Sequence, residues 1–233
     1  MSNDKPKLVK GITPKGCAVW PRLNTPDEYE GKKTYKSGLI LSAEDAADLI
    51  DKIDTATADC LAATKEKLSD AVKNGKTGDI KAKAKKALAA LETASPYTAA
   101  VDSDGEETGD VMFKFKSNAD FKDGKTGKIK QIKVPLFDSK GKPTTVMIYG
   151  GSTIRVAYAL VPYHMAATNK VGVSLRIEGI KVIEPAKSGG GYDANSLGFG
   201  EEEDGYESSG LEDDDSSDSS DDSDADPDEV TDF

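Results

Sequence analysis

Charge is distributed very unevenly along this chain. The segment from Tyr192 to Phe233 contains no lysine or arginine but 18 of the 42 acidic residues, which leaves 24 acidic and all 31 basic residues in the first 191 positions. The net charge of −11 therefore combines a basic body of +7 with an acidic tail of −18. The tail has too little apolar content to bury a core, so we expect it to be disordered. The folded part is restricted to roughly the first 190 residues.

Membrane, secretory and zinc-binding classes have little support in the sequence. The chain has no run of about 18 apolar residues, so we expect no membrane-spanning helix. Residues 1–7 lack the hydrophobic core of a signal peptide, and Cys17 and Cys60 form no CxxC motif. With His164 as the single histidine, we expect no structural zinc site. These features predict a reduced cytoplasmic protein.

Residues 42–94 have the periodicity of helices. Ser42 followed by Asp45 is a helix start, and apolar residues then recur about every 3.6 positions until residues 74–75. A second helical segment is expected at residues 80–91. The two segments predict a helical hairpin, or one broken helix, inserted between strands. Four lysines on this insertion fit a solvated helix face better than a nucleic-acid contact: Lys81, Lys83, Lys85 and Lys86.

Most of the remaining sequence before the tail reads as strands and turns. An extended arm is expected at residues 5–25 and a first strand at residues 34–41. Further strands are expected at residues 111–116, 129–137, 144–149, 153–163 and 171–184. In the last of these the apolar phase changes at Gly179, which indicates a bulge. Five or six short strands with a helical insertion predict a mainly β protein built on a small closed or nearly closed barrel.

The domain boundary is expected at the glycine-rich segment that precedes the tail. Residues 188–191 read Ser-Gly-Gly-Gly, the composition of a flexible linker. We therefore expect one folded domain at residues 1–187, with its helical insertion at about 42–94. The hinge and the disordered acidic tail then occupy residues 188–233.

No arrangement of residues fits an enzyme. Gly-Lys-Thr at residues 75–77 and 124–126 imitates a phosphate-binding loop, but Asp70 and Ala119 stand where that loop needs its first glycine. The lone His164 leaves serine and cysteine nucleophiles without a general base. Acidic residues of the body fall on helix faces and in turns, so no Mg²⁺ site for a nuclease is expected. We predict no catalytic activity, no metal and no cofactor.

Binding chemistry is better represented. Single-stranded nucleic acid is held by cations that follow its phosphates and by aromatic faces on which its bases stack. Alternation places Lys114 and Lys116 on one strand face, with the neighbouring phenylalanines turned toward the core. Arg155 and Tyr163 lie at the two ends of another strand face, and for Tyr163 base stacking and core packing fit the pattern equally well. Other lysines cluster nearby: Lys32, Lys33 and Lys36 by the first strand, and Lys122, Lys125, Lys128, Lys130 and Lys133 around a hairpin.

Several motifs taken together resemble one family. They are Phe-Lys-Phe-Lys at 113–116, Asp-Ser-Lys-Gly-Lys at 138–142, Gly-Gly-Ser at 150–152, Tyr-Ala-Leu-Val-Pro-Tyr at 158–163, and a glycine-rich hinge before an acidic tail that ends in Asp-Phe. The chain resembles the single-stranded DNA-binding proteins of short-tailed bacteriophages (podoviruses) that encode their own replisome. The resemblance keeps its register from about residue 111 to residue 184 and continues as composition in the tail.

This resemblance implies a fold, a function and partners. It implies an OB-fold barrel capped by a helix, in a homodimer that coats and anneals single-stranded DNA during phage DNA replication, recombination and repair. It also implies contacts with the phage DNA polymerase and the phage helicase-primase through the acidic tail, in the cytoplasm of the infected bacterial host. In that family the tail and its terminal aromatic residue compete with DNA for the basic groove.

The resemblance also implies roles for single residues. DNA-binding roles fall on Lys32, Lys114, Lys116, Arg155 and Tyr163, and the charge pattern adds Lys33, Lys128 and Lys130. Asp232 and Phe233 are the expected partner-binding residues. Two departures from the family pattern are Asn118, where a groove tyrosine is expected, and Ala157, where a lysine is expected.

A second hypothesis is open at this point. The chain is also compatible with an acidic-tailed interaction factor, or a chaperone for basic proteins, that uses the tail and leaves the barrel idle. Retention of residues 1–191 on single-stranded DNA resin, with elution by salt, separates the two hypotheses.

Overall fold

The computed structural model describes residues 8–122, 124 and 126–186. The chain divides into two units, Met1–Gly191 and Tyr192–Phe233, and the second unit lies wholly outside the described residues. The expected hinge, the expected disorder of the tail, and Asp232 and Phe233 therefore also lie outside them. Among the described residues, no helix is long and apolar enough to cross a membrane.

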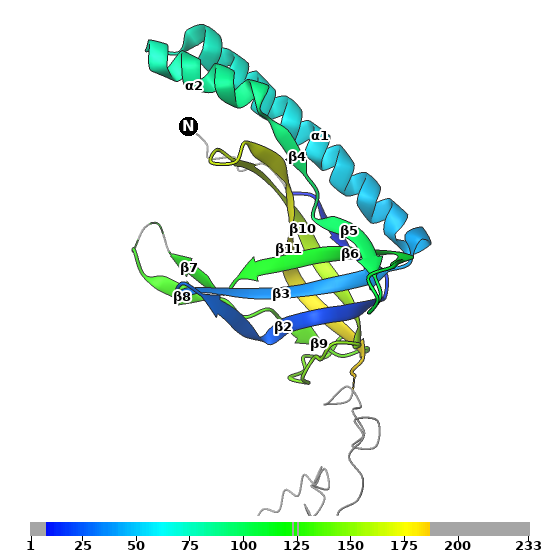
Figure 1. Ribbon diagram of the computed structural model, residues 1–233. Coiled ribbons are helices and arrows are strands. Elements are labelled where there is room, and N and C mark those ends of the chain that lie inside the picture. The colour runs from blue at the N-terminus through cyan, green and yellow to red at the C-terminus, as the bar shows by residue number, and fades with distance from the viewer. Residues whose placement is uncertain (1–7, 123, 125, 187–233) are drawn as a thin grey trace, which may run out of the picture. The chain divides into compact units, whose positions relative to one another are not determined.

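Five long strands close into a barrel (Figure 1). They are β2 (Gly16–Tyr29), β3 (Lys32–Leu41), β6 (Glu107–Asn118), β10 (Thr153–Met165) and β11 (Lys170–Glu184). The order around the barrel is β2-β3-β6-β11-β10, and β10 pairs with β2 to close it. The β6–β11 pair is parallel and the others are antiparallel. A closed five-stranded barrel of this kind is an OB-fold, as the family resemblance implies.

The barrel interior is filled by apolar residues at alternating positions along the strands. Phe113 and Phe115 of β6 are 0% and 2% exposed, and Leu39 of β3 and Leu175 of β11 are both fully buried. The register between β10 and β11 shifts between Ala157 and Tyr158 of β10, which pair with Gly179 and Ile177 of β11. The apolar phase of β11 therefore changes near the bulge predicted at Gly179. The two phenylalanines are core residues, as the alternation predicts, and the lysines between them point outward.

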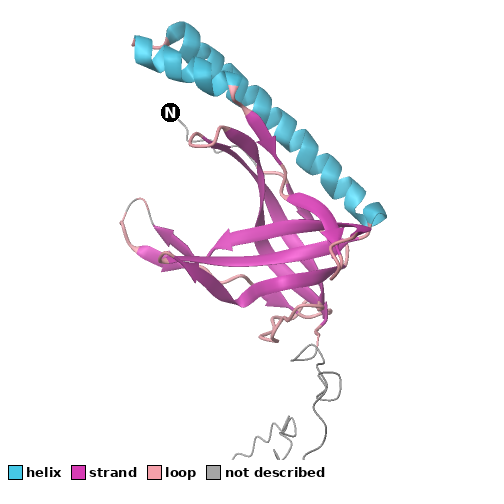
Figure 2. Cartoon of the chain, viewed as in Figure 1, coloured by secondary structure: helices cyan, strands magenta, loops and turns pink. Residues whose placement is uncertain are grey.

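The predicted helical insertion is a hairpin of two helices (Figure 2). In α1 (Ala43–Asn74), the Asp45 amide donates to the Ser42 side chain at 3.2 Å, which caps the start as predicted. This helix buries Ala46, Leu49 and Ile53 against the barrel core and projects beyond the barrel (Figure 1). The second helix, α2 (Gly78–Ala89), folds back along it and leads into the next strand.

Short strands extend the barrel at its edges. β1 (Lys10–Ile12) pairs with β10, β4 (Glu92–Ala94) and β9 (Leu136–Phe137) pair with β11, and β5 (Tyr97–Val101) pairs with β6. A separate hairpin is formed by β7 (Asp120–Lys122) and β8 (Ile129–Gln131), and it follows directly from the end of β6.

Three sequence predictions for strands were wrong. The arm expected at residues 5–25 is β1 and most of β2, because a strand with two register shifts tolerates Pro21 and Pro26. The strand expected at residues 129–137 is interrupted between β8 and β9.

The strand expected at residues 144–149 is irregular backbone. The Asn24 side chain explains why it needs no strand partner. This amide donates to the Val146 carbonyl at 2.8 Å and accepts from the Ile148 amide at 3.0 Å, so it takes the place of a neighbouring strand.

Candidate nucleic-acid interface

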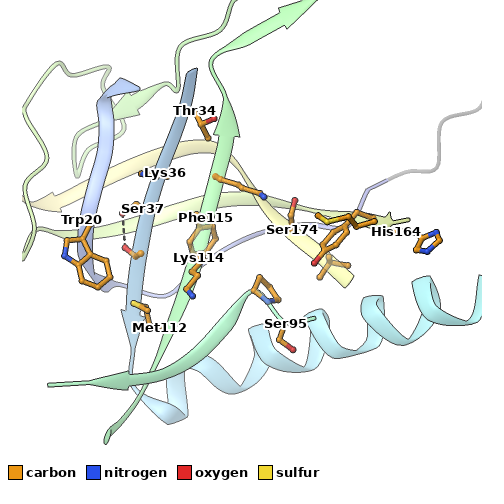
Figure 3. Close-up of a pocket in the computed structure, with 16 residues that line it drawn as sticks. Trp20, Thr34, Lys36, Ser37, Ser95, Met112, Lys114, Phe115, His164 and Ser174 are labelled. Carbon is orange, nitrogen blue, oxygen red and sulfur yellow. Dashed lines mark hydrogen bonds between the residues drawn. The ribbon is translucent and has the colours of Figure 1, made fainter. Parts of the chain in front are cut away.

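A cleft of about 950 Å³ lies on the outer face of the barrel (Figure 3). Its walls come from β2, β3, β6, the ends of β10 and β11, and the linker between β4 and β5. The residues lining it are Trp20, Thr34, Lys36, Ser37, Gly38, Ser95, Pro96, Met112, Lys114, Phe115, Lys116, Tyr163, His164, Met165, Val173 and Ser174. The linker is held against β6 because the Lys114 amide donates to the Pro96 carbonyl at 2.8 Å. The cleft therefore follows the second and third barrel strands, the face on which OB-folds bind oligonucleotides.

Four cationic residues form a row across four adjacent strands. Arg22 of β2 is the register partner of Lys36 of β3, which is the partner of Lys116 of β6, which is the partner of Arg176 of β11. Register partners lie on the same face of a sheet, so the row crosses the outer face of the barrel. Lys114 lies one outward position from Lys116 along β6, opposite Gly38. We call these five residues, the four partners and Lys114, the cationic row.

Carboxylates pair with two members of the cationic row and leave others unpaired. Asp27 forms an ion pair with Lys36, and this hydrogen bond lowers the pKa of the Asp27 carboxyl. Glu178 pairs with Arg176 at 2.7 Å and with Lys10 at 2.9 Å; the Lys10 bond, more than the Arg176 bond, lowers the pKa of the Glu178 carboxyl. Lys114 and Lys116 form no ion pair with the described part of the chain.

Tyr163 stands at the end of β10, on the wall of the cleft. It is half-buried and lines the cleft, so it is not part of the core. Its backbone is held by α1, because the Cys60 thiol donates to the Tyr163 carbonyl at 3.6 Å. Of the two readings that the sequence left open, the geometry agrees with an aromatic face available to a ligand.

The structure brings some of the predicted DNA-binding residues together and separates others. Lys114, Lys116 and Tyr163 line the same cleft. Lys32 and Lys33 begin β3 directly after the Glu30-Gly31 turn, and Lys128 and Lys130 belong to the β7–β8 hairpin region. That hairpin lies beside the start of β3, where the Ala119 amide donates to the Lys33 carbonyl at 2.9 Å (Figure 1). These four lysines therefore extend from one end of the barrel face.

Arg155 does not line the cleft. It lies near the other end of β10 from Tyr163, and its Nε donates to the Thr13 carbonyl at 2.9 Å. In this position it ties the β1–β2 connection to β10. The register of β10 is compatible with the prediction that Arg155 and Tyr163 share a strand face. The two residues nevertheless do not lie in one site.

The sequence reasoning missed Trp20, Arg22 and Arg176. Trp20 and Arg22 were missed because residues 5–25 were interpreted as an arm and not as a strand with an outer face. The third could have been placed on the outer face from the apolar phase of Val173, Leu175 and Ile177. Within residues 8–122, 124 and 126–186, no three histidine, cysteine or acidic side chains are grouped to hold a metal ion.

Fold and cleft together define an OB-fold protein with a cationic, partly aromatic binding face. A family model described as single-stranded DNA-binding protein, bacteriophage T7, matches residues 18–185. The chain belongs to this family, whose description names a binding activity and no reaction.

Individual relatives agree with the family. The single-stranded DNA-binding protein of Escherichia phage T7 is 41% identical over 106 residues, and that of Enterobacteria phage T3 is 37% identical over 99 residues. These matches cover 44% and 42% of this chain, and 44% and 43% of the two relatives, so the chain spans less than half the length of the curated relatives it matches. The crystal structure of gp2.5, a single-stranded DNA-binding protein encoded by bacteriophage T7, is similar with a TM-score of 0.65 and 27% identity, over 87% of this chain and 100% of that one.

Proposed function

We propose that this protein binds single-stranded DNA without sequence preference, on the outer face of β3 and β6. The observation that carries the proposal is the cationic row, which crosses the face of an OB-fold. Three of its members, Lys36, Lys114 and Lys116, line a cleft that also holds Tyr163. Lysine and arginine side chains contact phosphates regardless of sequence, and an aromatic face stacks on any base. Membership of the phage family supports the same function.

The proposed DNA path runs across the strands. Lys36, Lys114 and Lys116 contact the phosphates nearest the cleft, and Tyr163 stacks on a base. Lys32, Lys33, Lys128 and Lys130 contact the strand as it leaves the barrel face beside the β7–β8 hairpin. For Arg155 the resemblance to the family is the sole support, and it stays a prediction.

The acidic tail is proposed to regulate this face and to bind partners. The tail of −18 and the body of +7 attract each other, so the tail competes with DNA for the cationic row. When DNA occupies the row, the tail, with Asp232 and Phe233 at its end, is free to bind the phage DNA polymerase and helicase-primase. We further propose a homodimer that anneals complementary strands during replication, recombination and repair in the cytoplasm of the infected host.

A comparative titration tests the proposal. Labelled single-stranded and double-stranded oligonucleotides are titrated with the full chain and with a chain that ends at Gly191, each at two salt concentrations. We expect binding of the single strand, weakened by salt, and tighter binding after truncation. If neither chain binds the single strand at low salt, the alternative of an acidic-tailed interaction factor replaces this proposal. If truncation leaves the affinity unchanged, the competition by the tail is wrong.

A further inference from the structure

The single tryptophan of the chain is on the surface. Trp20 is 75% exposed, yet it lines the same cleft as Lys36, Lys114 and Tyr163. A large aromatic side chain left in water forgoes the stabilisation that burial would give it. In Figure 3 Trp20 extends from β2 at one end of the drawn cleft, while His164, the neighbour of Tyr163, lies at the other end.

The backbone at Trp20 is strained in a way that fixes this position. Its φ of 46° lies in the left-handed region, which is costly for a bulky side chain. The residue sits in the irregular part of β2, where the register with β3 shifts between Val19 and Arg22. A bulge of this kind turns a side chain away from the regular alternation of a strand. Such strain is concentrated at functional sites, where it pre-organises a residue.

The surface beside Trp20 is closely packed around a glycine. Gly38 is the register partner of Val19, and a Cβ at position 38 would lie 3.3 Å from the Val19 Cβ and 3.5 Å from the Met112 sulfur. Met112, one outward position before Lys114, also lines the cleft. The surface next to the indole is therefore low and apolar, and it leads directly to the cations of β3 and β6.

We propose that Trp20 is a second base-stacking residue, at the β2 end of the cleft. The cleft would then hold a single strand at two aromatic points, Trp20 and Tyr163, with Lys36 and Lys114 at the phosphates between them. The ligand that this position recognises is an unpaired nucleobase, of any identity. This inference rests on the proposed function, because it assigns a further contact to the same DNA path.

Tryptophan fluorescence tests the inference directly, since Trp20 is the single fluorescent indole of the chain. The full chain is titrated with an unlabelled oligothymidylate while its fluorescence is followed, and in parallel with a labelled one while anisotropy is followed. We expect the fluorescence to be quenched with the same midpoint as the anisotropy change. An oligonucleotide of the same length whose sugars carry no bases has the phosphates without the stacking partner, and it should leave the fluorescence unchanged.

Two variants separate stacking from folding. Trp20→Ala should weaken oligothymidylate binding by about 5- to 150-fold, the loss of one stacked base, while Trp20→Phe should retain most of the affinity. Trp20→Gly should weaken binding as much as Trp20→Ala without lowering the melting temperature, because glycine adopts a positive φ without strain.

The outcomes distinguish this inference from the function on which it rests. If the labelled strand binds but the fluorescence does not change and Trp20→Gly binds equally well, the role of Trp20 is wrong and the proposed function stands. If the labelled strand does not bind at all, both are wrong.

Discussion

Lys36 of β3 and Lys116 of β6 are direct cross-strand partners on the outer face of the barrel. Like charges in this position repel each other and destabilise the sheet. The protein neutralises only one of them within its described residues, through the ion pair between Lys36 and Asp27. Two lysines in register, with a carboxylate paired to only one of them, are the arrangement expected of a surface that binds an external polyanion.

Removing the carboxylate at Asp27 should tighten DNA binding. Asp27→Asn frees Lys36 for a phosphate and removes a negative charge from the path of the strand. The variant should bind an oligothymidylate more tightly and with a steeper dependence on salt, as measured by anisotropy at several salt concentrations. Glu184→Gln, an exposed acid at the end of β11, is the matched control and should change little.

The sign of the pH effect at Asp27 follows from its pKa. Because Lys36 lowers the pKa of the folded carboxyl, the ion pair stabilises the fold above the ordinary value of about 3.9 and is lost as the pH falls through the lower folded value. Between neutral pH and pH 5, DNA affinity should therefore not rise through protonation of Asp27. A rise in that interval that disappears in Asp27→Asn contradicts the assignment.

Tyr163 should contribute through its ring and not through its hydroxyl. Tyr163→Ala is expected to lose about 1–3 kcal/mol of binding free energy, the range for one stacked base, whereas Tyr163→Phe should bind nearly as well as the unaltered chain. Equilibrium titration measures both, and thermal unfolding checks the fold. If Tyr163→Ala has an unchanged dissociation constant and a lowered melting temperature, the role of Tyr163 is purely structural.

Gly172 should be required for the shape of the cleft wall. It is the register partner of Tyr163, and a Cβ there would lie 2.3 Å from the Ala94 carbonyl oxygen and 3.3 Å from the Tyr163 hydroxyl. Gly172→Ala must therefore displace β4, which pairs with β11 at this point. We expect a lower melting temperature and weaker DNA binding. Gly124→Ala, where the added Cβ meets nothing within 4 Å, is the control and should alter neither.

The barrel should lose stability at alkaline pH through Tyr158. This residue is 2% exposed and packs against Phe115, and burial raises the pKa of its phenol above the ordinary value of about 10. Its contribution is complete below pH 10 and is lost as the pH rises through the folded pKa. In Tyr158→Phe the alkaline fall of the melting temperature should be smaller, whereas the exposed Tyr29→Phe should keep it.

Local patterns predicted the parts of this protein that local chemistry determines. The capping of α1 by Ser42, the inward Phe113 and Phe115 with outward Lys114 and Lys116, and the phase change near Gly179 are all readable from a few consecutive residues. They made the barrel and one half of the binding face predictable.

The remaining features depend on pairing between distant segments. Single-strand periodicity contains no information that Lys116 will lie beside Arg176, or that Arg22 will lie beside Lys36. β2 was missed for a related reason. In a sequence Pro21 and Pro26 indicate turns or strand ends, but a strand tolerates proline where its register shifts. Trp20 belongs to that same irregular stretch, so its place in the cleft was missed with it.

The central claim is that the cationic face of β3 and β6 holds the DNA, and one titration tests it most directly. The unaltered chain and a variant with Lys36→Ala, Lys114→Ala and Lys116→Ala are titrated with the same single-stranded oligonucleotide over a range of salt concentrations. With about 0.7 lost from the salt slope for each phosphate contact, the slope of the triple variant should be smaller by about 2, with weaker binding at low salt and an intact fold. An unchanged slope and affinity in a folded triple variant would contradict the account, because the DNA would then be bound elsewhere.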